Sequence, residues 1–201
     1  MNELIIPDYY KKTVKSRSLL KYYKGLLVRA QKRFVFSVVC KYARMKGATI
    51  GRNSIMPFAL AKKANANLIV GDDVIIETSD IDLRSKVQIM DHVIINKNVS
   101  IIRVSHVIDD CPTYDTKYYA DLVVRPYSWL ATSSTVLPSV SCIDTGSVIG
   151  ACAVLVRDTE ENGVYSGNPA KLLRKHQGTF DELVVCGLMG GDFHYYKTAR
   201  K

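Results

Sequence analysis

One histidine stands where the sequence could hold a catalytic base. The stretch "NVSIIRVSH" (residues 98–106) runs through branched apolar residues and ends on His106, one of only four histidines. Imidazole titrates near neutral pH, so a positioned histidine can take the proton of a hydroxyl or amine as that group attacks an electrophile. A carboxylate often orients such a ring through its other nitrogen. The candidates for that carboxylate are Asp80, Asp82, Asp109 and Asp110. Taken by itself, the stretch favours a loop histidine without a catalytic role.

A repeat of six residues predicts the scaffold that would carry His106. Written in sixes from Leu130, the chain reads LATSST, VLPSVS, CIDTGS, VIGACA and VLVRDT, and the same pattern begins upstream at Ile50, Val70 and Ile95. A helix repeats every 3.6 residues and a strand every two, so a period of six indicates a coil of short strands. Each coil can bury its apolar side only against the next one, so we expect several coils to stack.

The repeat is interrupted at two places. Residues 56–68 break the first coils, and residues 103–123 ("RVSHVIDDCPTYDTKYYADLV") form a polar insertion rich in Tyr and Asp. The spacing also indicates an extra residue between 82 and 88. A loop that leaves a rigid scaffold is a common place for functional residues. We therefore expect the insertion with His106 to carry function.

The two ends of the chain differ from the repeat. Residues 14–46 have apolar positions at three- and four-residue spacing and lack proline, which predicts one or two helices. We expect these helices to cover an open end of the coil and hide its strand edges. Pro169 suits a first helical position, so a short basic helix is predicted from 169 to about 177, followed by a less regular tail.

Charge is distributed very unevenly. The net charge is +9, and residues 9–71 contain 15 of the 28 Lys and Arg residues and no Asp or Glu. Such a basic region can contact anionic lipid or another acidic surface. The five cysteines lack CxxC spacing, no apolar run approaches the length of a membrane span, and the first residues lack a signal pattern. We expect a cytoplasmic protein, with peripheral contact at the inner face of a membrane as a weaker hypothesis.

Three motifs in order carry a resemblance to a known family. "SWLATSSTVLPSV", "GSVIGACAVLVRD" and "SGNPAKLLRK" resemble the hexapeptide-repeat acyltransferases, in the branch of galactoside, maltose and polysaccharide O-acetyltransferases. The resemblance runs from about residue 50 to 175. It implies a mainly β protein with a left-handed parallel β-helix at 49–166, whose inserted loop is 103–123. A basic helical region at 1–48 would precede it, and a C-terminal helix and tail at 167–201 would follow.

The resemblance also implies roles for individual residues. His106 occupies the place of the family's general base, which reverses the interpretation made from the residues alone. The positions that match acetyl-CoA contacts are Trp129, Ala131, Thr132, Ala151, Arg157 and Arg174. Asp82, Asp109 and Asp110 are tentative partners of the substrate or of His106. Two departures bear on this match. Ala131 replaces a usual glycine, and no asparagine at 76–82 matches the residue that binds acceptor sugar in some relatives.

The implied function is acetyl transfer from acetyl-CoA to a hydroxyl of a sugar or glycan precursor, in polysaccharide biosynthesis. The acceptor would attack the thioester directly, without a metal, in a homotrimer and without nucleic acid as a partner. Two alternatives stay open, an N-acetyltransferase of an amino-sugar nucleotide and a non-catalytic hexapeptide-repeat scaffold. A zinc hydratase on the same scaffold is disfavoured, because no second histidine follows His106 at a ligand spacing.

Overall fold

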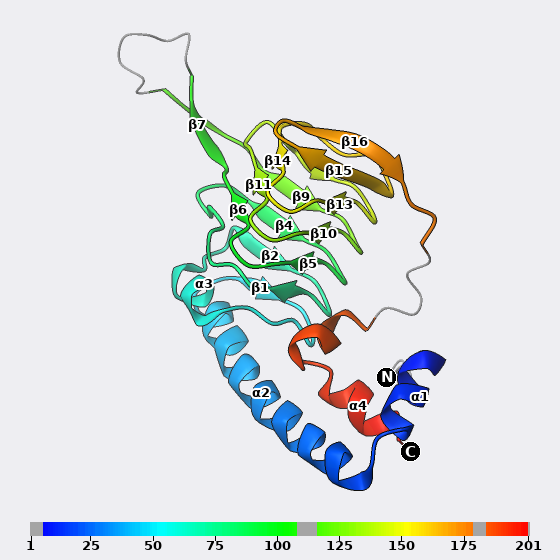
Figure 1. Ribbon diagram of the computed structural model, residues 1–201. Helices are drawn as coiled ribbons and strands as arrows, with labels where there is room; N and C mark the ends of the chain where they lie inside the picture. The colour runs from blue at the N-terminus through cyan, green and yellow to red at the C-terminus, as the bar shows by residue number, and fades with distance from the viewer. Residues whose placement is uncertain (1–5, 108–115, 179–183, 201) are drawn as a thin grey trace.

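The protein is a stack of strand-built coils standing on a long helix (Figure 1). The computed structural model describes residues 6–107, 116–178 and 184–200. Sheet A contains β1 (Thr49–Ile50), β2 (Leu68–Val70), β4 (Val87–Ile89), β9 (Leu122–Val124) and β12 (Cys142–Ile143). Sheet B contains β3 (Ile75–Ile76), β5 (Ile94–Ile95), β10 (Trp129–Leu130), β13 (Val148–Ile149), β15 (Gly163–Gly167) and β16 (Ala170–Lys175). Sheet C contains β6 (Ser100–Ile101), β11 (Thr135–Val136) and β14 (Val154–Leu155).

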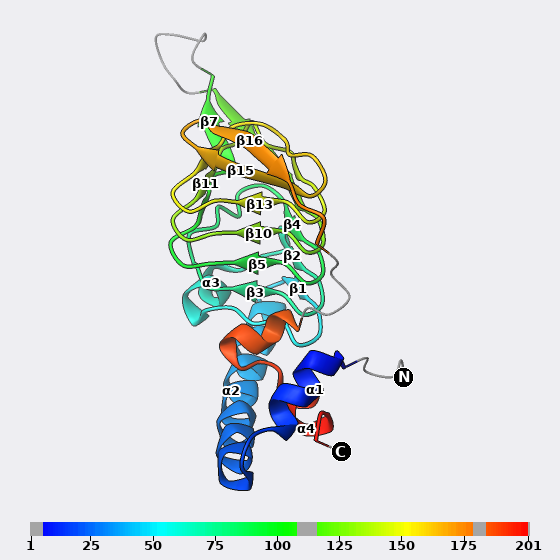
Figure 2. The same cartoon turned by 45° about the vertical axis from the view of Figure 1, so that its right-hand side comes forward.

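The chain visits sheets A, B and C in turn, and the strands of successive coils pair in parallel (Figure 2). In sheet B, Ile75 pairs with Ile94 and Trp129 pairs with Val148, so both pairs span the same length of chain. That length exceeds three hexapeptides by a single residue, so each of these coils holds one extra residue. For the coil from Ile75 to Ile94, the spacing between residues 82 and 88 indicated it. The predicted arrangement of stacked coils is confirmed in its parallel pairing, and its left-handed winding stays a prediction.

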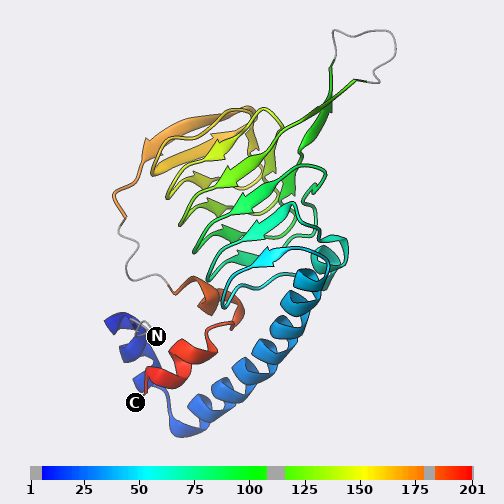
Figure 3. The ribbon, with the colours of Figure 1, turned by 180° about the vertical axis from the view of Figure 1, so that it is seen from behind.

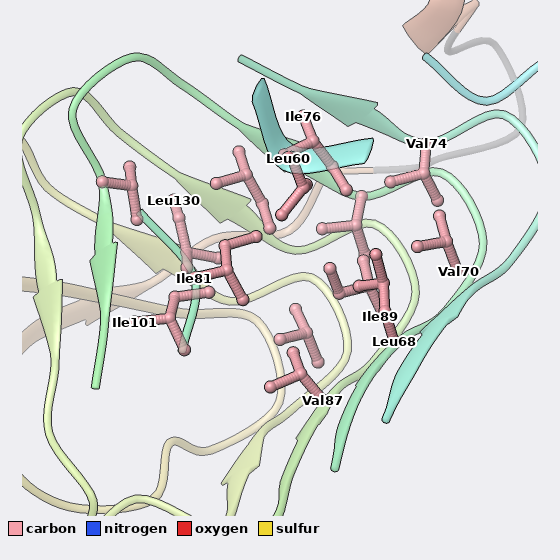
Figure 4. Packing of buried hydrophobic residues seen from close by; sticks show 14 of the residues in the cluster. Leu60, Leu68, Val70, Val74, Ile76, Ile81, Val87, Ile89, Ile101 and Leu130 are labelled. Atoms are coloured by element: carbon pink, nitrogen blue, oxygen red, sulfur yellow. The ribbon is translucent and has the colours of Figure 1, made fainter. Parts of the chain in front are cut away.

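Branched apolar side chains fill the interior of the stack. In each two-residue strand of sheet B the second residue is buried, as in Ile76, Ile95, Leu130 and Ile149. Figure 4 shows Ile76 and Leu130 packed among the inward side chains of sheets A and C, including Leu68, Ile89 and Ile101. A side chain stacked in this way contacts its equivalents one coil above and one coil below. The apolar position of the hexapeptide is therefore the core position.

Two corners of each coil turn through left-handed backbone. Corner AB, between sheets A and B, holds Asp73, His92 and Tyr127, with φ of 55°, 59° and 61°. Corner BC, between sheets B and C, holds Asn98, Ser133 and Cys152, with φ of 57°, 60° and 59°. The remaining corner, CA, lies between sheets C and A and contains the insertion. Most of these corner residues are polar, which suits an exposed tight turn.

The N-terminal region forms two helices, α1 (Asp8–Lys15) and α2 (Leu19–Met45). The predicted helical region is confirmed, although it begins earlier than residue 14 and breaks at residues 16–18. The hydroxyl of Ser18 accepts a bond from the Lys21 amide and caps α2. The last turns of α2 bury Val39 and Ala43 against the first coil, so α2 covers the open end of the stack as expected (Figure 3).

The helix predicted at 169–177 is wrong. Residues 170–175 form β16, which pairs antiparallel with β15. The edge of β15 would otherwise carry unpaired backbone groups, and β16 satisfies them after a turn at Gly167, whose φ is 100°. The C-terminal region instead has a 3-10 helix, η1 (Val185–Met189), and α4 (Phe193–Thr198), while α3 (Phe58–Lys63) fills the early interruption.

Candidate functional site

His106 ends a strand that leaves the stack at corner CA. β7 (Val104–His106) pairs antiparallel with β8 (Lys117–Tyr119) to form a hairpin that projects beyond the coils (Figure 1). In sheet B, the chain between the paired residues Ile94 and Trp129 is longer than an ordinary coil such as the one from Ile75 to Ile94. Residues 104–119 account for the whole difference. The inserted segment is thus shorter than the predicted 103–123, because Arg103 and residues 120–124 belong to the coils.

Arg103 fixes the root of this hairpin. Its side chain is fully buried, and its guanidinium donates hydrogen bonds to the backbone carbonyls of Val140 at 2.7 Å, Asp121 at 3.4 Å and Leu137. The Ala120 amide donates to the Arg103 carbonyl at 3.0 Å, which ties the two ends of the insertion together. Burial lowers the pKa of Arg103 to about 10, still well above neutrality, so the residue carries its charge.

The sequence reasoning placed Arg103 in a polar loop and missed its role as an anchor. The available signal was its position two residues beyond the last inward apolar residue, Ile101, at the place where the repeat stops. A guanidinium suits this corner because it offers five donors, and the extra residues of the corner turn several carbonyls inward. The hairpin that carries His106 therefore stands on a buried, hydrogen-bonded base.

A pocket of about 620 Å³ lies at the foot of the hairpin. Its lining residues are Lys63, Asn65, Asn67, Ile81, Asp82, Leu83, Arg84 and Tyr119. Val104 pairs with Tyr119 and His106 with Lys117, and residues two apart on a strand share a face. His106 therefore lies on the same face of the hairpin as Tyr119, about 7 Å further along the strand. Tyr119 therefore lines the pocket, and His106 lies further out on the same hairpin.

The carboxylate of Asp82 lies in this pocket. It accepts side-chain bonds from Arg84 at 2.9 and 2.8 Å and a backbone bond from the Arg103 amide at 3.3 Å. The hydrogen bonds from Arg84 outweigh partial burial and lower the pKa of Asp82 to about 2. These contacts link Asp82 to the hairpin root, and its suggested role in orienting His106 stays a prediction. Asp109 and Asp110 lie outside the described residues.

Trp129 begins β10 in sheet B, with 44% of its surface exposed. Its indole Nε1 donates to the Asn96 side-chain oxygen at 2.6 Å, and the Asn96 amide nitrogen donates to Glu77 at 2.9 Å. These three residues come from three successive coils, so their side chains form a line across the outside of sheet B. The sequence analysis looked for an asparagine at 76–82 and missed Asn96, which the parallel register places beside Trp129.

The small residues of the predicted cofactor site meet at corner BC. The Ala131 amide bonds to the Ile149 carbonyl at 2.9 Å, and the Cys152 amide bonds to the Thr132 carbonyl at 3.1 Å. Ala131 is therefore aligned with Gly150, and Thr132 lies close to Ala151 in the next coil. Thr132 and Ala151 are both exposed. The structure brings these three positions together near Trp129, and their role as acetyl-CoA contacts stays a prediction.

The two predicted arginines lie elsewhere. Arg157 follows β14 at corner CA and is exposed. Arg174 lies in β16, opposite Val164 of β15, and is also exposed. Neither belongs to corner BC. Within one copy of the chain, His106 at corner CA and the Trp129 group in sheet B also occupy different sides of the stack. Among the described residues, no cluster of three His, Cys, Asp or Glu side chains could hold a metal ion.

Comparison with solved structures shows what kind of protein has this fold. A hexapeptide-repeat acetyltransferase of Vibrio cholerae O1 biovar eltor, complexed with acetyl-CoA, superposes with a TM-score of 0.58 at 19% identity and covers 83% of each chain. A maltose O-acetyltransferase of Clostridium difficile 630 gives a TM-score of 0.52 at 20% identity, covering 85% of this chain and 84% of its own. The chain has the fold of the hexapeptide-repeat acetyltransferases.

A third structure of the same fold comes from a different branch. It is an N-acyltransferase mutant of Bacillus cereus in complex with dTDP and coenzyme A. It matches with a TM-score of 0.51 at 13% identity and covers 65% of this chain and 74% of its own. At these identities the three likenesses concern the fold alone.

Two curated sequences are similar to parts of this chain. The Saccharomyces cerevisiae protein YJL218W, provisionally named an acetyltransferase, is 33% identical over 113 residues, 56% of this chain and 52% of the yeast protein. A protein of Lysinibacillus sphaericus named a probable macrolide acetyltransferase is 34% identical over 58 residues, 29% of this chain and 32% of its own. The matches span about half and a third of these relatives. No protein-family profile matches the chain.

Proposed function

We propose that this chain is an acetyltransferase that moves the acetyl group of acetyl-CoA to a hydroxyl of a sugar or glycan precursor. The observation that carries the proposal is the placement of His106. On the scaffold shared with acetyltransferases, the histidine lies exposed on a hairpin with a buried arginine anchor, and a pocket lies at the foot of that hairpin. The acetyltransferase names of the two partial sequence relatives support the same reaction.

The reaction assigned to this site is a direct transfer. His106 takes the proton of the acceptor hydroxyl as the oxygen attacks the thioester carbonyl. A C–O bond forms, the tetrahedral intermediate collapses, and the C–S bond breaks. The imidazolium then returns its proton to the departing CoA thiolate, so the histidine ends the cycle neutral. Trp129, Ala131, Thr132 and Ala151 would line the groove for the pantetheine arm, because small side chains leave the backbone of corner BC accessible.

The pocket at the foot of the hairpin is the proposed acceptor site. Tyr119 is 52% exposed and offers a ring on which an apolar sugar face can stack. Asn67, Asp82 and Arg84 supply amide, carboxylate and guanidinium groups of the kind that hydrogen-bond to hydroxyls. This combination of one aromatic face and several polar groups fits a polyhydroxylated acceptor better than an apolar one.

A homotrimer completes the proposed site. Within one copy His106 and Trp129 occupy different sides of the stack, whereas direct transfer requires the base and the thioester to meet. A cyclic assembly can bring the hairpin of one copy to sheet B of its neighbour. Each site would then combine His106 of one copy with the Trp129 group of the next.

The first test replaces the base. We expect His106→Ala to lower kcat by at least about a hundredfold, the lower range for a lost general base, with acetyl-CoA affinity within about twofold of wild type. Ser105→Ala is the matched control, because Ser105 is an exposed neighbour on the opposite face of β7. Full acetyl transfer by the His106→Ala protein would refute the catalytic assignment. Absence of acetyl-CoA binding by the wild type would favour the scaffold alternative.

A second test addresses the shared site. His106→Ala and Trp129→Ala chains are co-expressed in equal amounts with different tags. Activity is assayed at an acetyl-CoA concentration well below the wild-type KM, where each variant is weakly active alone. In a random trimer about one site in four combines a wild-type His106 with a wild-type Trp129, so about a quarter of wild-type activity should return. A site within one copy would recover none.

The N-acetyltransferase alternative rests on one observation, the likeness to the Bacillus cereus N-acyltransferase. It differs in the acceptor, since an amine replaces the hydroxyl while the role of His106 is unchanged. A panel of matched sugars and amino sugars, free and nucleotide-linked, separates the two. Faster turnover of the hydroxyl acceptors supports O-acetylation, and faster turnover of the amino sugars supports the alternative.

A further inference from the structure

The outer face of α2 carries a continuous apolar stripe. Tyr23, Leu27, Phe34, Val38 and Met45 follow one another at alternating intervals of four and seven residues, which keeps them on one side of a helix of 3.6 residues per turn. Their exposed fractions are 62%, 62%, 72%, 53% and 76%. Leu20, at the start of the helix, is 83% exposed and extends the stripe.

The opposite face of α2 is already used inside the protein. Tyr22 stacks on Tyr196 of α4 with ring centroids 5.2 Å apart, and Arg29 forms an ion pair with the buried Asp192 at 2.7 Å. Further along, Val39 and Ala43 are buried against the coil. Contacts at both ends therefore fix the rotation of α2, and the stripe cannot turn inward. Figure 3 shows α2 leaving the stack with its outer side uncovered.

Cations accompany the stripe, and the described carboxylates beside the N-terminal helices, Asp8 and Asp192, are already paired with Lys11 and Arg29. Lys21, Lys24 and Lys41 are exposed on α2, and Lys12 and Lys15 are exposed on α1. Residues 9–71 contain no Asp or Glu. The surface around α2 is thus both apolar and strongly basic, a combination found in helices that lie in the headgroup region of anionic bilayers.

Charge decides between the possible occupants of the stripe. A second copy of α2 would bring Lys41 and its neighbours against equivalent lysines, with no carboxylate of this region to neutralise them. An anionic bilayer accepts the apolar side chains between its headgroups and attracts the lysines at the same time. Among the described residues, no helix is long and apolar enough to cross a membrane.

We propose that the outer face of α2 binds flat on the surface of an anionic lipid bilayer. This property is independent of the transferase activity. It would hold the enzyme at a membrane surface, where lipid-attached acceptors are concentrated in two dimensions. The hairpin that begins with β7 projects from the stack far from the beginning of α2 (Figure 1).

The test is flotation of the full chain with vesicles. We expect wild-type protein to float with vesicles made from phosphatidylcholine and phosphatidylglycerol in a two-to-one ratio, and not with pure phosphatidylcholine. Raising the salt to 1 M shortens the screening length to about 3 Å and should weaken the binding. The double variant Leu27→Glu/Phe34→Glu should lower the partition coefficient at least tenfold. Lys21→Gln/Lys24→Gln, which leaves the stripe intact, should lower it roughly thirtyfold.

The control is Leu173→Glu, a comparable change at a 65% exposed leucine in β16. It should float like wild type, and circular dichroism melting should show that every variant is folded. Two results would overturn the proposal: no flotation of wild type on anionic vesicles, or flotation that the double variant leaves unchanged. If the double variant instead dissociates the oligomer in light scattering while wild type ignores vesicles, the stripe is an interface between copies.

Discussion

Replacing Arg103 with methionine tests the link between the buried corner and the hairpin that carries His106. Methionine keeps most of the length of the side chain and removes the guanidinium. The carbonyls of Leu137, Val140 and Asp121 then lose their donor at a corner that is closed to solvent. Because Arg103 also lies at the root of β7, the same change should disturb the base of the hairpin.

The expected loss of stability follows from those three acceptors. A buried polar group left unpaired destabilises by about 1–3 kcal/mol. The weak 3.4 Å bond to Asp121 contributes least. Removing the guanidinium also removes the cost of burying its charge, the same burial that lowers the pKa of Arg103. We expect a net decrease of about 2–4 kcal/mol in the free energy of unfolding. Arg103→Lys keeps the charge and one or two donors, so its decrease should be about half as large.

Urea unfolding and steady-state kinetics together provide the assay. At a temperature where the Arg103→Met protein remains folded, kcat should fall about tenfold or more while the affinity for acetyl-CoA changes little, because the proposed cofactor groove lies at corner BC. Arg52→Met is the matched control, since Arg52 is paired with Asp72 on the surface and its side chain is 85% exposed. The control should leave both readouts close to wild type.

Two results would refute this reasoning. If Arg103→Met unfolds at the same urea concentration as wild type, the three hydrogen bonds do not stabilise the corner. If stability falls but kcat stays at the wild-type value, the hairpin does not depend on Arg103 for its position. Partial rescue of kcat by Arg103→Lys would separate positioning from a general loss of packing.

Three further predictions concern other parts of the molecule. The bonds from Arg84 lower the pKa of Asp82 to about 2 from its ordinary 3.8, so the stabilisation from this carboxylate is present above about pH 4 and is lost as the pH falls towards 2. In urea unfolding, Asp82→Asn should be about 1 kcal/mol less stable than wild type at pH 6, after allowance for the exposed Arg84. The difference should close by pH 2.5, and a difference that stays constant with pH would contradict the prediction. Trp129→Ala should raise the KM for acetyl-CoA about tenfold with a smaller change in kcat, because the hydrogen bond to Asn96 holds the indole beside the proposed groove. Unchanged kinetics would show that Trp129 is not part of the cofactor site. Gly25→Ala should lower the melting temperature, because the new Cβ would lie 2.6 Å from the hydroxyl of the buried Tyr196. This is expected although alanine favours a helix over glycine by about 1 kcal/mol, and a higher melting temperature would show that Tyr196 can move aside.

The amino-acid sequence determined the repetitive part of this protein. A branched apolar residue every six positions forces the coils, because each coil buries that residue only against its neighbours. The apolar spacing of residues 14–46 likewise determined α2, and the interrupted repeat marked the segment that carries His106. These features are local or periodic, so neighbouring residues are enough to specify them.

Tertiary structure decided what depends on pairing between distant residues. Residues 170–175 (AKLLRK) are good helix formers, yet pairing with the open edge of β15 makes them a strand. From the sequence alone Arg103 is expected in a loop. In the fold its guanidinium is buried and donates hydrogen bonds to the carbonyls of Leu137 and Val140, which belong to the next coil. The same register places Asn96 beside Trp129 and sets His106 on another side of the stack. Such contacts arise only when coils stack, because the hydrogen-bond partner of each corner belongs to a neighbouring turn of the chain.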